Sequence, residues 1–348
     1  MKQLKLISKE FVWDNPEDLY KACHVSTIAR NEKGDLAVAY FGGTKEGSLD
    51  LGIWLSRKID GQWEKPRRIK YVYGFQHWNP ILRYDGNGHL VLMYKIGHNV
   101  QEWYTLISES NDFGETWDHS REAVEGDHTP RISTKNRLII QGDNWFGGTS
   151  VETNTTHDCL IDVSRDGGKT WTLHPIPFDH IVHEHVGTIE WQGIKELWAS
   201  DPEVVLRWDG VIQPTLWSLK PGHLSCLMRS SRGCLFRSDS DDNGETWCKA
   251  YPTQLPNNNC GIDIAQMPDD TLVLFYNPIS VNWGERTPLS ASISQDNGEN
   301  WTAPWDLEVE PGEYSYPFAL PDGNNRIDLT YTWRRKKIVH CVLEITDI

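Results

Sequence analysis

Four copies of one eight-residue motif recur along the chain, and this repeat constrains the fold more than any other feature. The copies begin at Ser110, Ser164, Ser240 and Ser294, each with Asp two residues on, Gly four residues on and Trp at its end. A fifth, degenerate copy ends at Trp63, and three of the four intervals between the tryptophans are 54 residues. A fixed period of this size indicates repeated supersecondary units, most often the blades of a β-propeller.

Each residue of the motif has a structural explanation. Glycine supplies the positive φ that a tight hairpin turn requires, and aspartate accepts hydrogen bonds from backbone N–H groups of that turn. Tryptophan is large enough to fill the space between neighbouring sheets. We therefore interpret all copies as turn and packing elements that specify the fold, and we look for functional residues elsewhere.

A second repeat predicts the number of units. Short runs rich in β-branched and aromatic residues, bounded by Gly, Asn or Asp, are typical of strands. Six such runs occur, at residues 34–40, 88–94, 136–141, 222–228, 270–276 and 325–331. The chain is therefore predicted to be all-β, a six-bladed β-propeller. Its last strand, near 338–343, is expected to pair with the N-terminal segment and remove exposed sheet edges.

The whole chain, residues 1–348, is expected to form this one domain. The one long interval, 76 residues between Trp171 and Trp247, exceeds the others by 22 residues. We place this surplus within 172–212, between the third and fourth blades.

Charge and composition exclude several classes of partner. The net charge of −15 disfavours nucleic acids and anionic membrane surfaces. No segment approaches the roughly 20 apolar residues of a membrane-spanning helix, and no apolar signal sequence is visible, so we expect a cytoplasmic protein. Seven cysteines without paired spacing agree with reduced thiols. No phosphate-binding glycine loop is present and no cofactor is predicted, while the oligomeric state stays open.

Candidate functional residues lie where the predicted strands end near the central channel. A propeller binds its ligand on the face where this channel opens, with side chains from several blades. Polar and titratable residues at equivalent points of different blades are therefore the candidates. They are His24, Glu46, Asp50, His77, Asn79, Gln213, Arg229, Arg286, Tyr314 and Arg334.

The motifs and these segments together resemble a known family. The repeated motifs on six blades are similar to the Asp boxes, or BNR repeats, of the sialidase (neuraminidase) superfamily, over nearly the whole chain. Residues 23–47, 78–80, 313–317 and 330–334 most resemble its branch of bacterial predicted neuraminidases. The resemblance implies three arginines that bind the substrate carboxylate, a tyrosine nucleophile with a glutamate partner, and an aspartate acid/base.

Three candidates match that pattern in order. Arg229 and Arg286 each precede a box, as the second and third arginines of the family do, and Tyr314 corresponds to the nucleophile. Two convergent arginines suit a carboxylate, which they can bind bidentately. A neutral tyrosine suits an anomeric carbon next to a carboxylate, because it avoids the repulsion that Asp or Glu would meet.

Other positions depart from the pattern. His24 stands where the first arginine is expected, and Gln213 stands where the glutamate is expected and cannot act as a base. The acid/base falls in the loop that holds Glu46 and Asp50, of which Glu46 is the preferred candidate. Arg334 is a candidate for the missing third cation.

Three functions are compatible with these residues. The first is an exo-glycosidase that releases a terminal sugar bearing a carboxylate from an acidic oligosaccharide or glycan. The second is a lyase that cleaves uronic acid glycans by β-elimination, with His24 or His77 as base and Tyr314 as acid. The third is a glycan-binding propeller without catalysis. His183 and His185 alternate onto one predicted strand face, but further ligands are missing, so no metal site is predicted.

Overall fold

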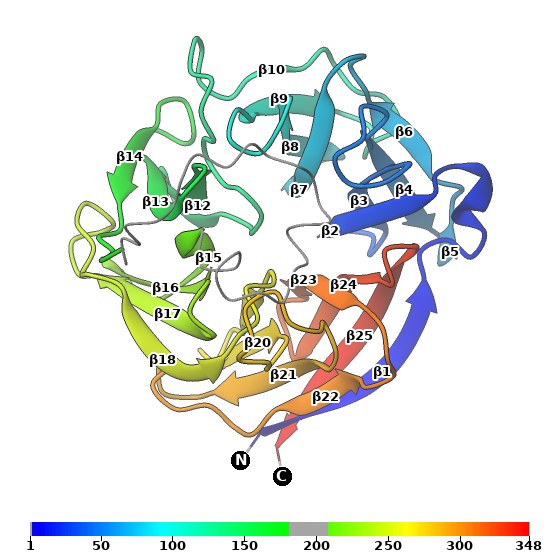
Figure 1. Cartoon of the computed structure of the whole chain (residues 1–348). Helices are drawn as coiled ribbons and strands as arrows, with labels where there is room; N and C mark the ends of the chain where they lie inside the picture. Colours follow the sequence, from blue (N-terminus) through cyan, green and yellow to red (C-terminus); the bar gives the residue numbers. More distant parts are fainter. Residues whose placement is uncertain (1, 181–207, 348) are drawn as a thin grey trace.

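The computed structural model describes residues 2–180 and 208–347, and these residues are built almost entirely of β-strands. Their only helical element is the single 3-10 turn η1 (Pro16–Asp18). No helix in these ranges is long and apolar enough to cross a membrane. Antiparallel units lie around a common centre and form a ring (Figure 1).

Six antiparallel units follow one another along the chain. Unit one contains β2 (Ala22–Arg30), β3 (Leu36–Gly43), β4 (Gly52–Ile59), β5 (Gln62–Trp63) and β6 (Arg67–Lys70). Unit two contains β7 (Gln76–Gly86), β8 (His89–Gly97), β9 (Tyr104–Ser110) and β10 (Arg121–Glu122). Unit three contains β11 (Ile139–Gln141), β12 (Asn144–Glu152), β13 (Thr156–Ser164) and β14 (Thr172–Pro175).

The second half of the chain repeats this organisation. Unit four contains β15 (Asp209–Lys220), β16 (His223–Ser230), β17 (Cys234–Ser240) and β18 (Tyr251–Pro256). Unit five contains β19 (Asp263–Gln266), β20 (Leu272–Tyr276), β21 (Leu289–Ser294) and β22 (Trp305–Glu308). Unit six contains β23 (Tyr314–Pro321), β24 (Arg326–Trp333), β25 (Lys337–Asp347) and β1 (Lys2–Phe11). Units three and four share one hydrogen-bonded sheet, because β13 and β15 pair in parallel over two residues.

Unit six is assembled from both ends of the chain. Strand β1 pairs antiparallel with β25, with Leu6 opposite Leu343, and occupies the outer edge of the unit (Figure 1). The predicted pairing of the last strand with the N-terminal segment is therefore confirmed. The pairing covers the edge that β25 would otherwise expose.

Neighbouring units pack through separate hydrophobic clusters. The described residues contain six clusters, one at each junction of the ring. The junction between unit six and unit one is filled by Phe318 and Ile338 on one side and Tyr40 on the other. Burial of each large apolar side chain contributes about 1.5–3 kcal/mol to stability. The junction between unit six and unit one therefore stabilises the packing of the last unit against the first.

The repeated motifs form the turns after the third strands, as their residues predict. In unit two, Ser110 Oγ accepts a hydrogen bond from the backbone of Gly114 (2.8 Å), and Asp112 Oδ1 accepts one from the backbone of Thr116 (2.8 Å). Trp117 Nε1 donates to the Gly114 carbonyl (3.1 Å). The copies in units three, four and five repeat these bonds. The motifs therefore have the structural role inferred for them.

A third repeat lies at the centre of the ring and is a feature of the backbone. One residue near the start of each unit has a positive φ although it is not glycine. These six inner-bulge residues are Val25 (51°), Asn79 (43°), Ile132 (66°), Gln213 (54°), Asn259 (59°) and Tyr316 (54°). In four of the units the bulge shifts the register between the first and second strands. A bulge of this kind changes the direction in which the local side chains point.

One predicted strand was misplaced. Residues 136–141 form only the short β11, which belongs to the innermost part of unit three. The strand equivalent to the other five predicted runs is β12, since it pairs with the strand that ends in the Ser164 motif. The predicted insertion at 172–212 begins with β14 and ends with β15, and residues 181–207 within it lie outside the described residues.

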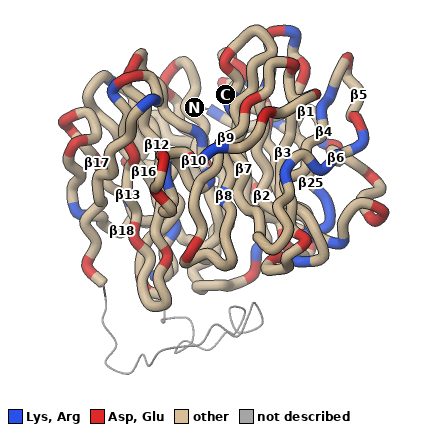
Figure 2. Tube along the Cα trace, turned by 90° about the horizontal axis from the view of Figure 1, so that it is seen from above, with Lys and Arg blue, Asp and Glu red and all other residues tan. Residues whose placement is uncertain are grey.

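The side view shows a thick disc with the two chain ends next to one another (Figure 2). Basic and acidic residues are interspersed over its loops and turns (Figure 2). No large surface of a single charge is evident in this view, so any concentration of charge that serves a ligand must be local.

Candidate functional site

A cavity of about 120 Å³ opens at the centre of the ring and receives side chains from all six units. Its lining is made by Val25, Glu46, Gly47, Gln76, Trp78, Asn79, Asn99, Val100, Gln101, Trp103, Glu152, His157, Trp208, Ile212, Gln213, Arg229, Trp283, Arg286, Tyr316 and Arg335. We refer to it as the central pocket.

The inner bulges supply the floor of this pocket. Val25, Asn79, Gln213 and Tyr316 line it directly, each from a different unit. Asn259 lies one hydrogen bond behind, where its Oδ1 accepts from Arg229 Nε (2.9 Å). The bulged backbone therefore directs side chains from several units to one point.

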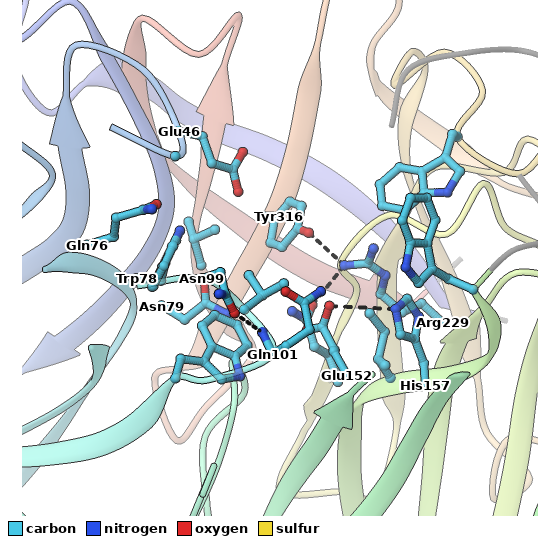
Figure 3. Close-up of a pocket in the computed structure, with 18 of the residues that line it drawn as sticks. Glu46, Gln76, Trp78, Asn79, Asn99, Gln101, Glu152, His157, Arg229 and Tyr316 are labelled. Atoms are coloured by element: carbon cyan, nitrogen blue, oxygen red, sulfur yellow. Dashed lines mark hydrogen bonds and ion pairs between the residues drawn. The ribbon is translucent and has the colours of Figure 1, made fainter. Parts of the chain in front are cut away.

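Arg229, at the end of β16, is a buried cation with neutral partners. Its side chain is 2% exposed. Besides Asn259, its Nη1 donates to Gln213 Oε1 (3.0 Å) and to the hydroxyl of Tyr316 (2.6 Å) (Figure 3). No described residue forms an ion pair with it, and Nη2 has no hydrogen-bond partner in residues 2–180 and 208–347. A buried guanidinium in this state favours an anionic ligand.

Two further arginines reach the pocket, and both carry acidic partners. Arg286 Nη1 lies 2.7 Å from Glu313 Oε1, and Arg335 Nε lies 2.9 Å from Glu313 Oε2. Arg335 also forms an ion pair with Glu46. Burial acts to raise the pKa of Glu313, but Arg286 and Arg335 outweigh burial and lower it. The carboxylates hold both guanidinium groups in place beside the pocket.

Tyr316, and not Tyr314, is the tyrosine of the pocket. The side chain of Tyr314 is buried in the hydrophobic cluster between units five and six, and it does not line the pocket. Along an extended strand the two residues would share a face, but the bulge at Tyr316 separates their directions. Burial raises the pKa of Tyr316, while Arg229 and Arg286 act to lower it.

Arg335 lines the pocket, whereas its neighbour Arg334 is exposed. Both have φ near 50° in the turn between β24 and β25, which Lys336 closes by donating its backbone N–H to the Trp333 carbonyl (2.9 Å). Arg334 lies over the Trp333 ring, 4.7 Å from its centre, and is not among the residues that line the pocket. Arg335, one residue after Arg334, therefore takes the place of the candidate third cation.

Glu152 and His157 line the pocket although the sequence did not single them out. They stand at the end of β12 and the start of β13, with Glu152 Oε2 3.7 Å from His157 Nε2 (Figure 3). Burial raises the pKa of Glu152 to about 7, although Arg229 acts in the opposite direction. Burial and Arg229 lower the pKa of His157 to about 3. At neutral pH, the pocket therefore holds a neutral imidazole and a carboxyl group that is partly protonated.

The two candidate histidines lie outside the pocket lining. His24 is buried, its Nδ1 lies 2.9 Å from Thr332 Oγ1, and its ring edge packs on Tyr316 at 4.4 Å between centres. Burial, helped by nearby arginines, lowers the pKa of His24 well below its usual value. His77 stacks between two tyrosines and accepts a hydrogen bond from the backbone of Val72 (3.1 Å). Burial lowers the pKa of His77 to about 4.

The remaining candidates divide between pocket and loop. Glu46, Asn79 and Gln213 line the pocket. Asp50 lies outside it, where its Oδ2 accepts from the backbone N–H (2.9 Å) and hydroxyl (2.8 Å) of Thr44 and fixes the loop that carries Glu46. Within the described ranges, no three His, Cys, Asp or Glu side chains are grouped as metal ligands. His183 and His185 lie outside the described residues.

A buried pair of residues from unit three supports the bulges from below. Lys135 Nζ donates to the carbonyls of Ile262 (2.8 Å) and Pro317 (2.6 Å). Asn136 Nδ2 donates to the carbonyl of Pro214 (3.1 Å). Since Pro214 and Pro317 follow Gln213 and Tyr316, this pair fixes the backbone next to both side chains that bind Arg229 Nη1.

Comparison with known proteins identifies the family. A model of the BNR repeat-like domain matches residues 34–329. The chain belongs to the BNR repeat-like family. No curated protein sequence matches it. The resemblance of its boxes to those of the sialidase superfamily is thereby confirmed.

Solved structures, several of them sialidases, share the fold at low sequence identity. A Dyadobacter fermentans protein of unknown function superposes with a TM-score of 0.71 at 14% identity, over 99% of both chains. A Hadza microbial sialidase gives 0.68 at 16%, over 98% of this chain and 68% of that one. The intramolecular trans-sialidase from Ruminococcus gnavus gives 0.63 at 12%, over 97% and 96%. This similarity establishes the fold.

Proposed function

We propose that this BNR-family chain is a six-bladed β-propeller and an exo-glycosidase that releases a terminal sugar bearing a carboxylate. The six antiparallel units, the cluster between unit six and unit one, and the pairing of β1 with β25 support a closed ring of six blades. The central pocket supports the activity, because side chains of all six units converge there.

The observation that carries the proposal is the buried, neutral environment of Arg229. A guanidinium withdrawn from water without a carboxylate partner is costly, and a bound carboxylate would supply the missing charge. Its Nη2 is available for such a ligand. Arg286 from unit five and Arg335 from unit six also line the pocket and can orient a carboxylate, while Glu313 and Glu46 balance their charges. An acidic sugar therefore satisfies this pocket better than a neutral one.

Tyr316 is the proposed nucleophile. Its hydroxyl already accepts a hydrogen bond from Arg229 (2.6 Å), and this bond strengthens when the phenol releases its proton to solvent and the oxygen becomes negative before attack. A neutral phenol also avoids the repulsion that a carboxylate nucleophile would meet beside an acidic anomeric carbon. Both arguments transfer the role first assigned to Tyr314 to the tyrosine of the pocket.

Glu152 is the proposed general acid. A general acid must hold its proton near the working pH, and the pKa of about 7 gives Glu152 that property. Glu46, the first candidate from the sequence, is engaged in an ion pair with Arg335. We therefore assign to Glu46 the positioning of Arg335, and the proton transfer to Glu152.

A uronate lyase is the second candidate, and one observation favours it. His157 is a neutral imidazole in the pocket lining and lies on the same side as Arg229 (Figure 3). In a β-elimination, His157 would take the C5 proton, Tyr316 would protonate the departing oxygen, and Arg229 would stabilise the enolate-like carboxylate. His24 and His77 are less suited to this role because neither lines the pocket.

One experiment separates these functions. The purified protein is incubated with a panel of sialosides and uronate-containing oligosaccharides, and products are followed by proton NMR. A new reducing-end anomeric signal without a vinyl proton is the expected result for the glycosidase. A new vinyl proton would replace that assignment with the lyase. Ligand line broadening without turnover would leave a glycan-binding propeller.

A further inference from the structure

A second cavity lies at the opposite end of the innermost strands. It has a volume of about 340 Å³, within the range of small-molecule sites, and is lined by units one, two, three and six. Strands β2 and β7 lie at the inner side of the ring (Figure 1) and reach both cavities. Val25 and Asn79 line the central pocket, and Arg30 and Arg83 further along the same strands line the second cavity. At about 3.3 Å per residue, the two cavities are roughly 15 Å apart. We call the second one the rear pocket.

The walls of the rear pocket are mostly apolar. Ten of its fifteen described lining residues are apolar, among them Met93, Leu138 and Phe318. The charged lining residues are three arginines, each from a different unit, and one aspartate. An apolar cavity with a few convergent polar groups is the usual form of a ligand site.

Arg137 is a partly buried cation whose hydrogen-bond partners are neutral. It donates through Nη2 to the Ile264 carbonyl (2.6 Å) and through Nη1 to the Ala319 carbonyl. No acidic side chain of residues 2–180 and 208–347 forms an ion pair with it. Asp263 accepts the backbone N–H of the same two residues (2.9 Å each), so one residue stands between the carboxylate and the guanidinium group. Burial lowers the pKa of Arg137, and Asp263 acts in the opposite direction. An anion in contact with Arg137 would stabilise its charge directly.

Arg30 and Arg83 bring two more guanidinium groups to the rear pocket. Each has a carboxylate partner outside the lining, Asp328 for Arg30 and Asp85 for Arg83. The Nε atoms of both arginines are nevertheless buried without a hydrogen bond to any described residue. The Nε of Arg137 has no such bond within the described ranges either. Since buried donors are normally paired and a carboxylate can accept two parallel N–H groups of one guanidinium, these donors favour an anionic head group.

The walls and the arginines together define the ligand. A small inorganic anion would leave the apolar walls uncovered, and an apolar molecule would leave the N–H donors unpaired. A cation would be repelled by three guanidinium groups. A carboxylate attached to an apolar body satisfies both the donors and the walls.

We propose that the rear pocket binds a small carboxylic acid with an apolar body. Its carboxylate pairs with Arg137, and its body packs against Met93, Leu138 and Phe318. The site goes beyond the proposed glycosidase and does not rest on it, because no described residue lines both pockets.

Calorimetry with three probes tests the chemistry of the ligand. The probes are 4-phenylbutyrate, 4-phenylbutan-1-ol, which lacks the charge, and acetate, which lacks the apolar body. We expect the wild type to bind 4-phenylbutyrate at least about tenfold more tightly than either of the others. Equal affinity for the acid and the alcohol would overturn the anionic site, and equal affinity for the acid and acetate would overturn the apolar one. Absence of binding by 4-phenylbutyrate would overturn the whole proposal.

Arg137→Met tests the head-group contact. It should weaken binding of 4-phenylbutyrate at least about fivefold and leave binding of the alcohol unchanged. The matched control is Arg121→Met, which removes an exposed arginine of β10 that lines neither pocket. Thermal unfolding verifies that each variant is folded. Unchanged affinity for the acid in a folded Arg137→Met would contradict the proposal.

Asp322→Asn keeps the test decisive if Arg137→Met does not fold. Asp322 is the one acidic residue of the described lining, and its Oδ1 accepts from the backbone of Asn324 (2.8 Å) and Arg326 (3.0 Å). Asparagine retains an acceptor oxygen for this turn and removes a charge that repels the ligand. We expect binding of 4-phenylbutyrate to tighten about twofold or more. Weaker binding would show that the pocket does not select an anion.

Arg229→Met separates the rear pocket from the central pocket. Binding of 4-phenylbutyrate should be unchanged in this variant, because Arg229 lines only the central pocket. Loss of binding in Arg229→Met, with binding retained in Arg137→Met, would place the probe in the central pocket and overturn the inference. Failure of the proposed glycosidase would leave this result unaffected, since the probe contains no sugar.

Discussion

The outer turns and the inner bulges both repeat around the ring, but they repeat different properties. At the outer turns, which follow the third strands, four motifs share Ser, Asp, Gly and Trp and the same backbone hydrogen bond to the Asp. At the inner bulges, the backbone repeats with φ between 43° and 66°, while all side chains except two asparagines differ. The common side chains indicate a structural role that these four units share. The different side chains on one backbone conformation indicate that each inner bulge has its own role.

The inner bulges and the outer turns both contain non-glycine residues with positive φ, for example Tyr316 (54°) and Phe113 (54°). The outer turns also place glycine at positive φ, for example Gly114 (85°). A non-glycine residue in this region costs about 1–3 kcal/mol, and it persists only where surrounding contacts determine it. Lys135 and Asn136 provide such contacts next to Gln213 and Tyr316. Changes to the side chains of the inner bulges are therefore expected to affect function, and changes at the outer turns are expected to affect stability.

The largest functional effect is expected at Tyr316. Tyr316→Phe removes the hydroxyl that Arg229 binds, and it should lower kcat at least about 10²-fold with little change in the melting temperature. Tyr314→Phe is the matched control, because that ring lies outside the pocket lining. Steady-state kinetics on the substrate found by NMR makes the comparison. A greater loss of activity in Tyr314→Phe would contradict the assignment of the pocket tyrosine.

Glu152→Gln should impair only reactions that need a proton donor. We expect a loss of about 10²-fold for a sugar leaving group and less than about tenfold for p-nitrophenol, which departs without protonation. Activity of the wild type should fall above about pH 7, where Glu152 loses its proton. The contribution of Glu152 to the free energy of unfolding should also fall as the pH rises from about 4 to about 7, because the folded state keeps a proton that the unfolded chain releases.

The matched variant for this test is Glu46→Gln, which weakens the ion pair with Arg335. It should impair both leaving groups by a similar factor. If Glu46→Gln instead showed the selective loss and Glu152→Gln did not, the acid would be Glu46 as the sequence first suggested.

Replacing Lys135 should weaken the support of the bulges. Lys135→Met leaves the carbonyls of Ile262 and Pro317 without their donor, and we expect a loss of about 2 kcal/mol or more in the free energy of unfolding. Denaturant unfolding measures this loss. Stability equal to that of the wild type would show that these carbonyls do not depend on Lys135.

The smallest effect is expected at an outer turn. Asp112→Ala removes the acceptor for Thr116 and should cost about 1 kcal/mol of stability at pH 7, without a change in kcat. Partial burial acts to raise the pKa of Asp112, but the bonds from Thr116 outweigh it and lower the pKa to about 2. The stabilisation should therefore be present above about pH 4 and vanish as pH falls toward 2. Loss of activity in a folded Asp112→Ala variant would contradict the view that the outer turns serve stability and the inner bulges serve function.

The fold could be predicted because its determinants repeat. The spacing of the motifs predicted the repeated units. The apolar run near 338–343 predicted the pairing with β1. The strand of unit three was missed although a signal existed. The other second-strand runs with a motif end 12 to 18 residues before its serine, for example Tyr94 before Ser110, whereas the run ending at Gln141 ends 23 residues before Ser164. Correct spacing would have pointed to β12 and to Glu152.

The site was only partly predictable, because its side chains are set by bulges and turns. Tyr314 and Arg334 were each close in sequence to the pocket residues Tyr316 and Arg335. Alternation along a strand could not distinguish them, since a bulge interrupts it. Proline was the available signal: Asn79, Gln213 and Tyr316 each precede one. Aligning these three dipeptides would have selected Tyr316.

The central claim is that Arg229 makes the pocket a carboxylate site, and its most direct test is calorimetry with one acidic sugar as the free acid and as its methyl ester. The account predicts that the ester binds the wild type more weakly by about 2–5 kcal/mol, and that Arg229→Met abolishes this difference. Equal affinity of acid and ester for the wild type would contradict the claim.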